Sequence, residues 1–133
     1  MTGMFMKKSR FSIQDVNTFL GEYTHFKGTL HSGQSIRIDG VVEGDIQSKG
    51  DVVVGEKSRV RANIVAKRII VAGEVIGNIE ALQGLEIAST GKVFGDISGA
   101  RLIIEKGAVY RGRVNMDVIT TDNPYEGQVE LTR

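Results

Sequence analysis

Four copies of one short motif place an acidic or amide residue at the same position, and such side chains can bind metal ions or transfer protons. The copies are VEGDI (42–46), VRANI (60–64), VIGNI (75–79) and VFGDI (93–97), which contain Asp45, Asn63, Asn78 and Asp96. A catalytic or metal-binding carboxylate needs other polar side chains that converge on it. Each copy instead places this residue between a small residue and an isoleucine, and no converging partners are apparent in the sequence. We therefore interpret these four residues as structural, capping backbone amides or facing water.

Other candidates for chemistry are few. His25 and His31 are the only histidines, and both precede the regular part of the sequence. The chain has no cysteine, which excludes disulfides and thiolate chemistry and fits a reducing compartment. It also lacks the phosphate-binding, dinucleotide-binding and nucleophile-elbow motifs. We therefore predict no enzyme, no catalytic residue, no metal site and no cofactor.

The elements that carry these residues repeat with a period near 17. An aliphatic pair recurs at steps of 16, 17, 16 and 17 residues. The pairs are Ile36/Ile38, Val52/Val54, Ile69/Val71, Leu85/Ile87 and Leu102/Ile104. The motif quoted above ends at Ile46, Ile64, Ile79 and Ile97, with altered copies FKGTL (26–30) and YRGRV (110–114). Two anchors with one mean period indicate a repeat architecture.

The repeat unit has the properties of one coil of a β-solenoid. Its apolar runs are short, rich in β-branched residues and bounded by glycine or polar residues, which is typical of strands. Seventeen residues are too few for a propeller blade, and the unit has no helical half. Glycines recur in the motif and after the aliphatic pairs, where a tight corner with positive φ is expected. The sequence thus predicts an all-β parallel β-helix of about five to six coils.

The regular pattern occupies residues 22–116, which leaves flexible tails at 1–21 and 117–133. Residues 12–20 could alternatively form a short amphipathic helix that begins at Ser12. No apolar run approaches a membrane span. The net charge of +1, with acidic residues among the arginines, predicts no nucleic-acid binding.

The two ends of such a rod carry unpaired backbone groups and bare aliphatic side chains. Since neither flank offers a clear cap, end-to-end association is the simplest way to satisfy the last strands. We therefore expect a filament. The predicted interface residues are Phe26, Leu30, Ile36, Leu102, Ile104, Tyr110 and Val114.

The order and period of these motifs resemble the bactofilins, bacterial cytoskeletal proteins that form polymers. The segments are FKGTL, IRIDGVVEGDI, VVVGEKS, RIIVAGEVIGNI and LIIEKGAVYRGRV, within residues 22–116. The resemblance implies a right-handed β-helix of triangular cross-section. It further implies assembly without nucleotide into non-polar filaments joined through both ends. These filaments scaffold cell-shape and cell-wall machinery, including synthesis or hydrolase proteins, in the cytoplasm.

In that family an apolar N-terminal tip followed by basic residues can tether filaments to the anionic inner face of the membrane. The residues Met4, Phe5 and Met6, followed by Lys7 and Lys8, resemble this tip. Two other readings stay open. One is a β-solenoid carbohydrate-binding module or enzyme with a site on one face, and the other is a monomeric rod that binds a partner.

Overall fold

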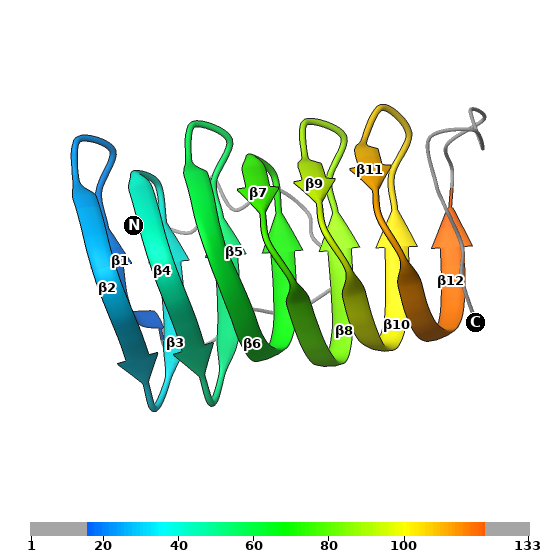
Figure 1. Ribbon diagram of the computed structural model, residues 1–133, viewed down its shortest axis with the longest axis horizontal. Coiled ribbons are helices and arrows are strands. Elements are labelled where there is room, and N and C mark those ends of the chain that lie inside the picture. The colour runs from blue at the N-terminus through cyan, green and yellow to red at the C-terminus, as the bar shows by residue number, and fades with distance from the viewer. Residues whose placement is uncertain (1–15, 122–133) are drawn as a thin grey trace.

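The structure is a computed structural model that describes residues 16–121, which form twelve strands joined by short corners (Figure 1). All strand pairings are parallel, and these residues contain no helix. The strands are β1 (Val16–Leu20), β2 (His25–Ser32), β3 (Ser35–Ile38), β4 (Val41–Ser48), β5 (Asp51–Val54), β6 (Arg59–Val71), β7 (Glu74–Ile76), β8 (Ile79–Ile87), β9 (Lys92–Phe94), β10 (Ile97–Ile104), β11 (Val109–Arg111) and β12 (Val114–Thr121). The predicted parallel β-helix is confirmed.

Equivalent side chains of successive coils stack into columns that fill the interior. The strand register aligns Ile36, Val52, Ile69, Leu85 and Leu102, and beside them Ile38, Val54, Val71, Ile87 and Ile104. All ten are buried, so the predicted aliphatic pairs are confirmed as core residues. Burial of one such side chain stabilises a fold by about 1.5–3 kcal/mol. We call the side of the rod that carries these two columns face A.

Two further columns come from the repeated motif and give the number of coils. One contains Phe26, Val42, Val60, Val75, Val93 and Tyr110. The other contains Leu30, Ile46, Ile64, Ile79, Ile97 and Val114. Since each column has one residue from each coil, the rod has six coils. We call the sides that carry these columns face B and face C.

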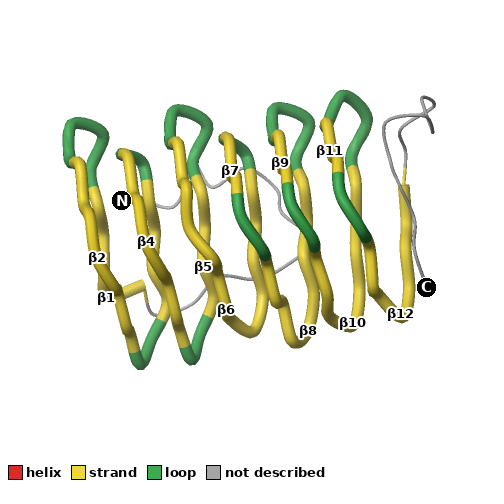
Figure 2. The backbone as a smooth tube through the Cα atoms, in the orientation of Figure 1, coloured by secondary structure: helices red, strands yellow, loops and turns green. Residues whose placement is uncertain are grey.

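The uneven spacing of the motif comes from the corner between faces A and B. This corner has four residues in four coils (21–24, 55–58, 88–91 and 105–108) and two residues in the other two (39–40 and 72–73). Figure 2 shows the resulting long and short loops along one edge of the rod. Each long corner is closed by a backbone hydrogen bond, such as the one from Ser58 N to Gly55 O of 3.1 Å. The change in corner length leaves the columns in register.

The repeated acidic or amide residue joins neighbouring coils by side-chain to backbone hydrogen bonds. The backbone amide of Asn78 donates to Asn63 Oδ1 (3.0 Å), that of Asp96 to Asn78 Oδ1 (3.2 Å) and that of Arg113 to Asp96 Oδ1 (3.2 Å). A side-chain acceptor at this position satisfies a backbone donor of the next coil. The structural interpretation of Asn63, Asn78 and Asp96 is therefore confirmed.

Glycine is needed at the corners for two different reasons. The motif glycines have a positive φ, as at Gly95 (143°), which residues with a side chain rarely adopt. The glycines that follow the aliphatic pairs were expected to share this conformation, and for Gly40 that expectation is wrong. A Cβ atom at Gly40 would instead collide with the carbonyl oxygens of Gly21 and Thr24 in the preceding coil. The close approach of two coils excludes a side chain there.

The rod begins earlier and ends later than the expected range 22–116. Residues Val16–Leu20 form strand β1, which pairs with β3, so the alternative prediction of a helix is wrong for these residues. At the other end β12 continues to Thr121 and pairs with β10. The flexible tails expected at 1–21 and 117–133 therefore fail at residues 16–20 and 117–121. Backbone pairing with the adjacent coil accounts for both extensions.

Candidate assembly interface at the two ends of the β-helix

Within residues 16–121, each terminal strand has a pairing partner on one side only. At the N-terminal end β1 pairs with β3 and β2 pairs with β4, and at the C-terminal end β11 pairs with β9 and β12 pairs with β10. These ends lie at opposite extremes of the rod (Figure 1). A strand edge of this kind carries backbone donors and acceptors that can pair with a further strand. The arrangement therefore offers a hydrogen-bonding edge at each end.

The N-terminal end carries apolar side chains that the rod covers only in part. Leu20, Phe26 and Leu30 each begin a column and are half-buried against the core. A second rod placed here would bury the rest of their surface, which is the main source of association energy between proteins. Phe26 and Leu30 lie where the sequence analysis placed them. Leu20 was missed because Thr18 occupies the first position of its pair, which breaks the aliphatic pattern.

The C-terminal end is closed by Tyr110 and Val114, the last members of their columns. Both are buried within the chain itself. The Tyr110 hydroxyl can donate to Gly95 O (2.8 Å) or Arg113 O (2.7 Å), so the ring fills the end of the column while its polar atom is satisfied. Ile119 of β12 lies beyond Leu102 and is half-buried, and the sequence analysis missed it too.

Three residues expected at the ends lie in the interior of the rod. Ile36 is flanked by Thr18 and Val52, Leu102 by Leu85 and Ile119, and Ile104 by Ile87 and Thr121. The strands β1 and β12 cover these positions, so a neighbouring subunit would not contact them. The other predicted site, the membrane-binding residues Met4, Phe5, Met6, Lys7 and Lys8, lies outside the described residues.

The faces of the rod show no cluster of residues suited to metal chemistry. In the described part of the chain, no group of three or more His, Asp or Glu side chains is placed to hold a metal ion. His25 is exposed and its Nε2 lies 3.1 Å from Glu43 Oε2. Residues 16–121 also contain no helix long and apolar enough to cross a membrane.

Two arginines of the rod lie beside carboxylates. Arg68 Nε lies 3.2 Å from Asp51 Oδ1, and Arg59 Nε lies 3.9 Å from Glu74 Oε1. A nucleic-acid surface requires a continuous basic patch. The carboxylates beside Arg59 and Arg68 offset the positive charge at these two positions.

Comparison with known proteins identifies the family. The sequence profile described as "Bactofilin: Polymer-forming cytoskeletal" matches residues 18–115. Bactofilin BacP of Myxococcus xanthus (strain DK1622) is 37% identical over 100 residues, which cover 75% of this chain and 42% of BacP. Bactofilin BacO of the same organism is 33% identical over 102 residues, which cover 77% of this chain and 81% of BacO. The chain thus spans less than half the length of BacP.

The structure also resembles a bactofilin of Thermus thermophilus, solved by cryo-electron microscopy in double helical filaments. The TM-score is 0.72 at 29% identity, and the match covers 75% of this chain and 99% of that chain. The likeness therefore includes nearly all of a subunit that was observed in a filament. With its six parallel coils and these sequence matches, the chain belongs to the bactofilins, a family of polymer-forming cytoskeletal proteins.

Proposed function

We propose that this protein assembles without nucleotide into filaments by stacking its β-helices end to end. The single observation that supports this most is that, among residues 16–121, each of the four terminal strands pairs on one side only. We call the contact between two stacked subunits a joint. Strand pairing across a joint would satisfy the backbone groups of the terminal strands. The half-buried Leu20, Phe26 and Leu30 would gain apolar contacts there. A bactofilin of similar structure forms double helical filaments, which supports assembly of this chain into filaments.

The first test is sedimentation of the purified protein in buffer without nucleotide at two protein concentrations. We expect most of the protein in the pellet at the higher concentration, and filaments in the same sample by negative-stain electron microscopy. Salt is expected to change the pelleted fraction little, because apolar burial and backbone pairing are screened less than surface charges. A single species of monomer mass at both concentrations would contradict the proposal and favour a monomeric rod that binds a partner.

We further propose that the filaments attach to the anionic inner face of the cell membrane through Met4–Lys8. Each basic residue near anionic lipid contributes about 1 kcal/mol, so one tip binds weakly. A filament would present many tips to one surface, and this avidity raises the overall affinity. In the cytoplasm such a filament would serve as a scaffold for cell-shape or cell-wall machinery, in keeping with the resemblance of the sequence to its family.

Deletion of residues 1–8 tests the attachment separately from assembly. The shortened protein is expected to form filaments of normal appearance but to lose flotation with vesicles that contain anionic lipid. The deleted residues precede β1, so strand pairing at the N-terminal end is retained. Full-length protein mixed with vesicles of neutral lipid is the control, and it shows how much of the binding depends on the charge of the lipid. Flotation of the shortened protein at the full-length level would refute the proposed tether.

A further inference from the structure

Face B carries two columns of outward-facing residues, one on each side of its buried column. The strand register aligns His25, Val41, Arg59, Glu74, Lys92 and Val109 in one, and Lys27, Glu43, Arg61, Ile76, Phe94 and Arg111 in the other. The residues between them, such as Val75 and Val93, are buried in the core, so alternation along each strand directs both columns outward. Every lysine and arginine in the two columns is exposed.

These columns are basic, although the whole chain has a net charge of only +1. They contain five lysines and arginines against two glutamates. Glu74 Oε1 lies 3.9 Å from Arg59 Nε, and Glu43 Oε2 lies 3.1 Å from His25 Nε2. In the described part of the chain, the other four cations form no ion pair; they are Lys27, Arg61, Lys92 and Arg111. Their charge is therefore available to an anionic partner.

Two apolar side chains lie among these cations. Ile76 is 40% exposed, and Phe94 is its half-buried neighbour in the next coil. Arg61 precedes this pair in the column and Arg111 follows it. Figure 1 shows the strands β7, β9 and β11, which carry three of these four residues, side by side on one side of the rod. Since apolar side chains gain free energy when they leave water, a fitting partner combines negative charge with an apolar layer.

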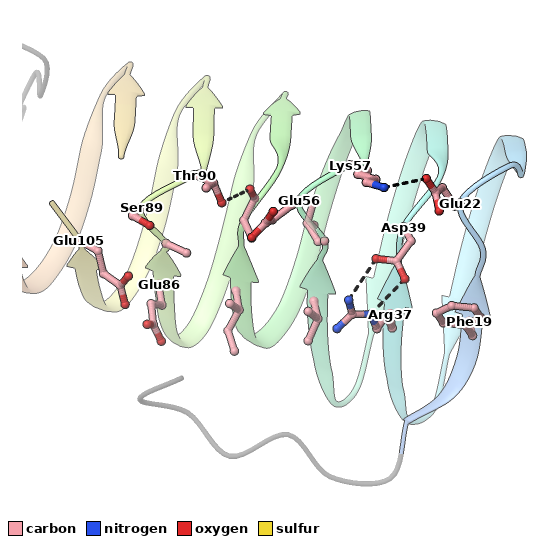
Figure 3. A pocket seen from close by; sticks show the side chains of 16 residues that line it. Phe19, Glu22, Arg37, Asp39, Glu56, Lys57, Glu86, Ser89, Thr90 and Glu105 are labelled. Carbon is pink, nitrogen blue, oxygen red and sulfur yellow. Dashed lines mark hydrogen bonds and ion pairs between the residues drawn. The ribbon is translucent and has the colours of Figure 1, made fainter. Parts of the chain in front are cut away.

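The other two faces lack this combination. A groove along face A and its corner with face B is lined by only two cations and five acidic residues, Glu22, Asp39, Glu56, Glu86 and Glu105 (Figure 3). Both cations are paired, Arg37 with Asp39 (3.1 Å) and Lys57 with Glu22 (3.3 Å). Among the described strands, the outward column of face C has no cation; it contains Gln47, Val65, Glu80, Ser98 and Asn115. Of the three faces, face B is the one suited to an anionic surface.

The corner between faces C and A also carries exposed cations. Lys67 and Arg101 lie there, and the exposed Leu82 lies in the coil between them. A corner is an edge of the rod, however, so a flat surface touches it along one line. The same surface placed on face B touches both outward columns. Lys67, Arg101 and Leu82 therefore provide matched controls for the residues of face B.

An anionic membrane has the properties that face B requires. Its headgroups supply negative charge over a plane, and apolar side chains can enter the boundary between headgroups and acyl chains. The two columns run along six coils, about 24 Å at the spacing between strands, which gives an extended contact. Nucleic acid fits less well, because its phosphates offer nothing to Ile76 and because Glu43 and Glu74 lie among the cations.

We propose that face B is the side of the rod that rests on an anionic membrane. Ile76 and Phe94 would lie at the level of the headgroups, with Arg61 and Lys92 beside lipid phosphates. This inference rests on the proposed attachment of the filaments to the membrane, and it names the face that makes the contact. The attraction between a cation and the lipid surface falls off within about 8 Å. The cations of face B therefore act once the proposed tip Met4–Lys8 holds a filament at the surface, and they determine which side faces the lipid.

The first test compares two double variants with the same change of composition. Arg61→Gln/Lys92→Gln removes one arginine and one lysine from face B, and Lys67→Gln/Arg101→Gln removes the same pair from the corner. Each basic residue near anionic lipid contributes about fivefold in affinity. Filaments of the face B variant should therefore need at least about 25-fold more anionic vesicles for half-maximal flotation, and those of the corner variant should match the natural protein. Equal losses, or a larger loss in the corner variant, would overturn the proposal.

Ile76→Ser tests the apolar part of the contact at constant charge. We expect flotation with anionic vesicles to weaken about fivefold, because the exposed part of Ile76 would no longer leave water on binding. The control is Leu82→Ser, since Leu82 is an exposed aliphatic residue outside face B. An unchanged affinity in Ile76→Ser, with a loss in Arg61→Gln/Lys92→Gln, would show that face B binds a polyanion such as nucleic acid or an acidic protein. That outcome would also overturn the proposal.

A fluorescent label reports directly which face lies on the lipid, and the absence of cysteine from the chain makes the labelling specific. Val41→Cys on face B and Val65→Cys on face C are matched, because both valines are half-buried and face outward on the paired strands β4 and β6. Lipids with a quencher in the headgroup should quench the label at position 41 several-fold more than that at position 65. Equal quenching, or stronger quenching at position 65, would contradict the proposal.

The outcomes for face B and for the tip can be told apart. Quenching is measured on filaments that are already bound, so it reports their orientation, whereas deletion of residues 1–8 changes the fraction that binds. Loss of flotation on this deletion, with equal quenching at positions 41 and 65, would refute the role of face B and leave the tip. Retained flotation, with quenching at position 41 alone, would refute the tip and leave face B. No flotation of the natural protein would refute both.

Discussion

Leu30→Asp is expected to abolish filaments and leave monomers or dimers in the supernatant. Leu30 begins the face C column at the N-terminal end and is half-buried there, so a joint would complete its burial. A carboxylate in that position would have to leave water without a partner at every joint. A cost of about 3 kcal/mol corresponds to a joint weaker by a factor of more than 100. Sedimentation and negative-stain microscopy without nucleotide provide the measurement.

The matched control is Thr29→Asp, the same residue introduced one position earlier on β2. Thr29 and its register partner Asp45 in the next coil are both exposed, so a carboxylate at position 29 stays in water, where its repulsion with Asp45 is weak. This variant should pellet like the natural protein. Filaments of normal length from Leu30→Asp, with a circular dichroism spectrum typical of strands, would show that the joint does not use this end. The size of the soluble product adds information, since dimers would indicate that the C-terminal ends still join.

Much of the rod could be predicted because its stability comes from repetition. The columns that contain Ile36 and Ile64 repeat aliphatic residues at one register, and a period near 17 makes this visible in the sequence. The sequence did not predict which corners have two residues and which have four. This difference leaves the columns in register, because a corner of either length returns the chain to the same position. The ladder formed by Asn63, Asn78 and Asp96 followed from the same regularity.

The boundaries could not be predicted because the terminal strands depart from the repeated residue types. Thr18 replaces the first aliphatic residue of its pair in β1, and Thr121 replaces the second in β12. Both strands form because their backbone pairs with the adjacent coil. This pairing uses backbone groups that nearly every residue has, so it leaves no signal in the side chains. For this reason Ile36, Leu102 and Ile104 seemed to lie at the ends. Each instead has one more coil beyond it.

Gly95→Ala should be the most destabilising of the single substitutions considered. Gly95 has a φ of 143°, and a Cβ atom there would collide with the carbonyl oxygen of Gly77 in the preceding coil. Its own amide donates to Arg111 O (3.0 Å), so the backbone cannot move away without breaking a bond between coils. We expect a loss of about 3 kcal/mol or more in the free energy of unfolding. For a domain of this size, that lowers Tm by roughly 10–15 °C.

The comparison must be made on unassembled protein, because filament formation stabilises the folded state by mass action and would mask the loss. Both variants are therefore built in the Leu30→Asp background and melted by circular dichroism. Gly33→Ala is the matched control, since Gly33 has no positive φ and a Cβ atom there meets nothing within 4 Å. Its Tm should stay within a few degrees of the parent. If the Tm of Gly95→Ala were also within a few degrees of the parent, the coils could separate at this corner. The close approach of the backbone at Gly95 to Gly77 would then not limit the stability of the rod.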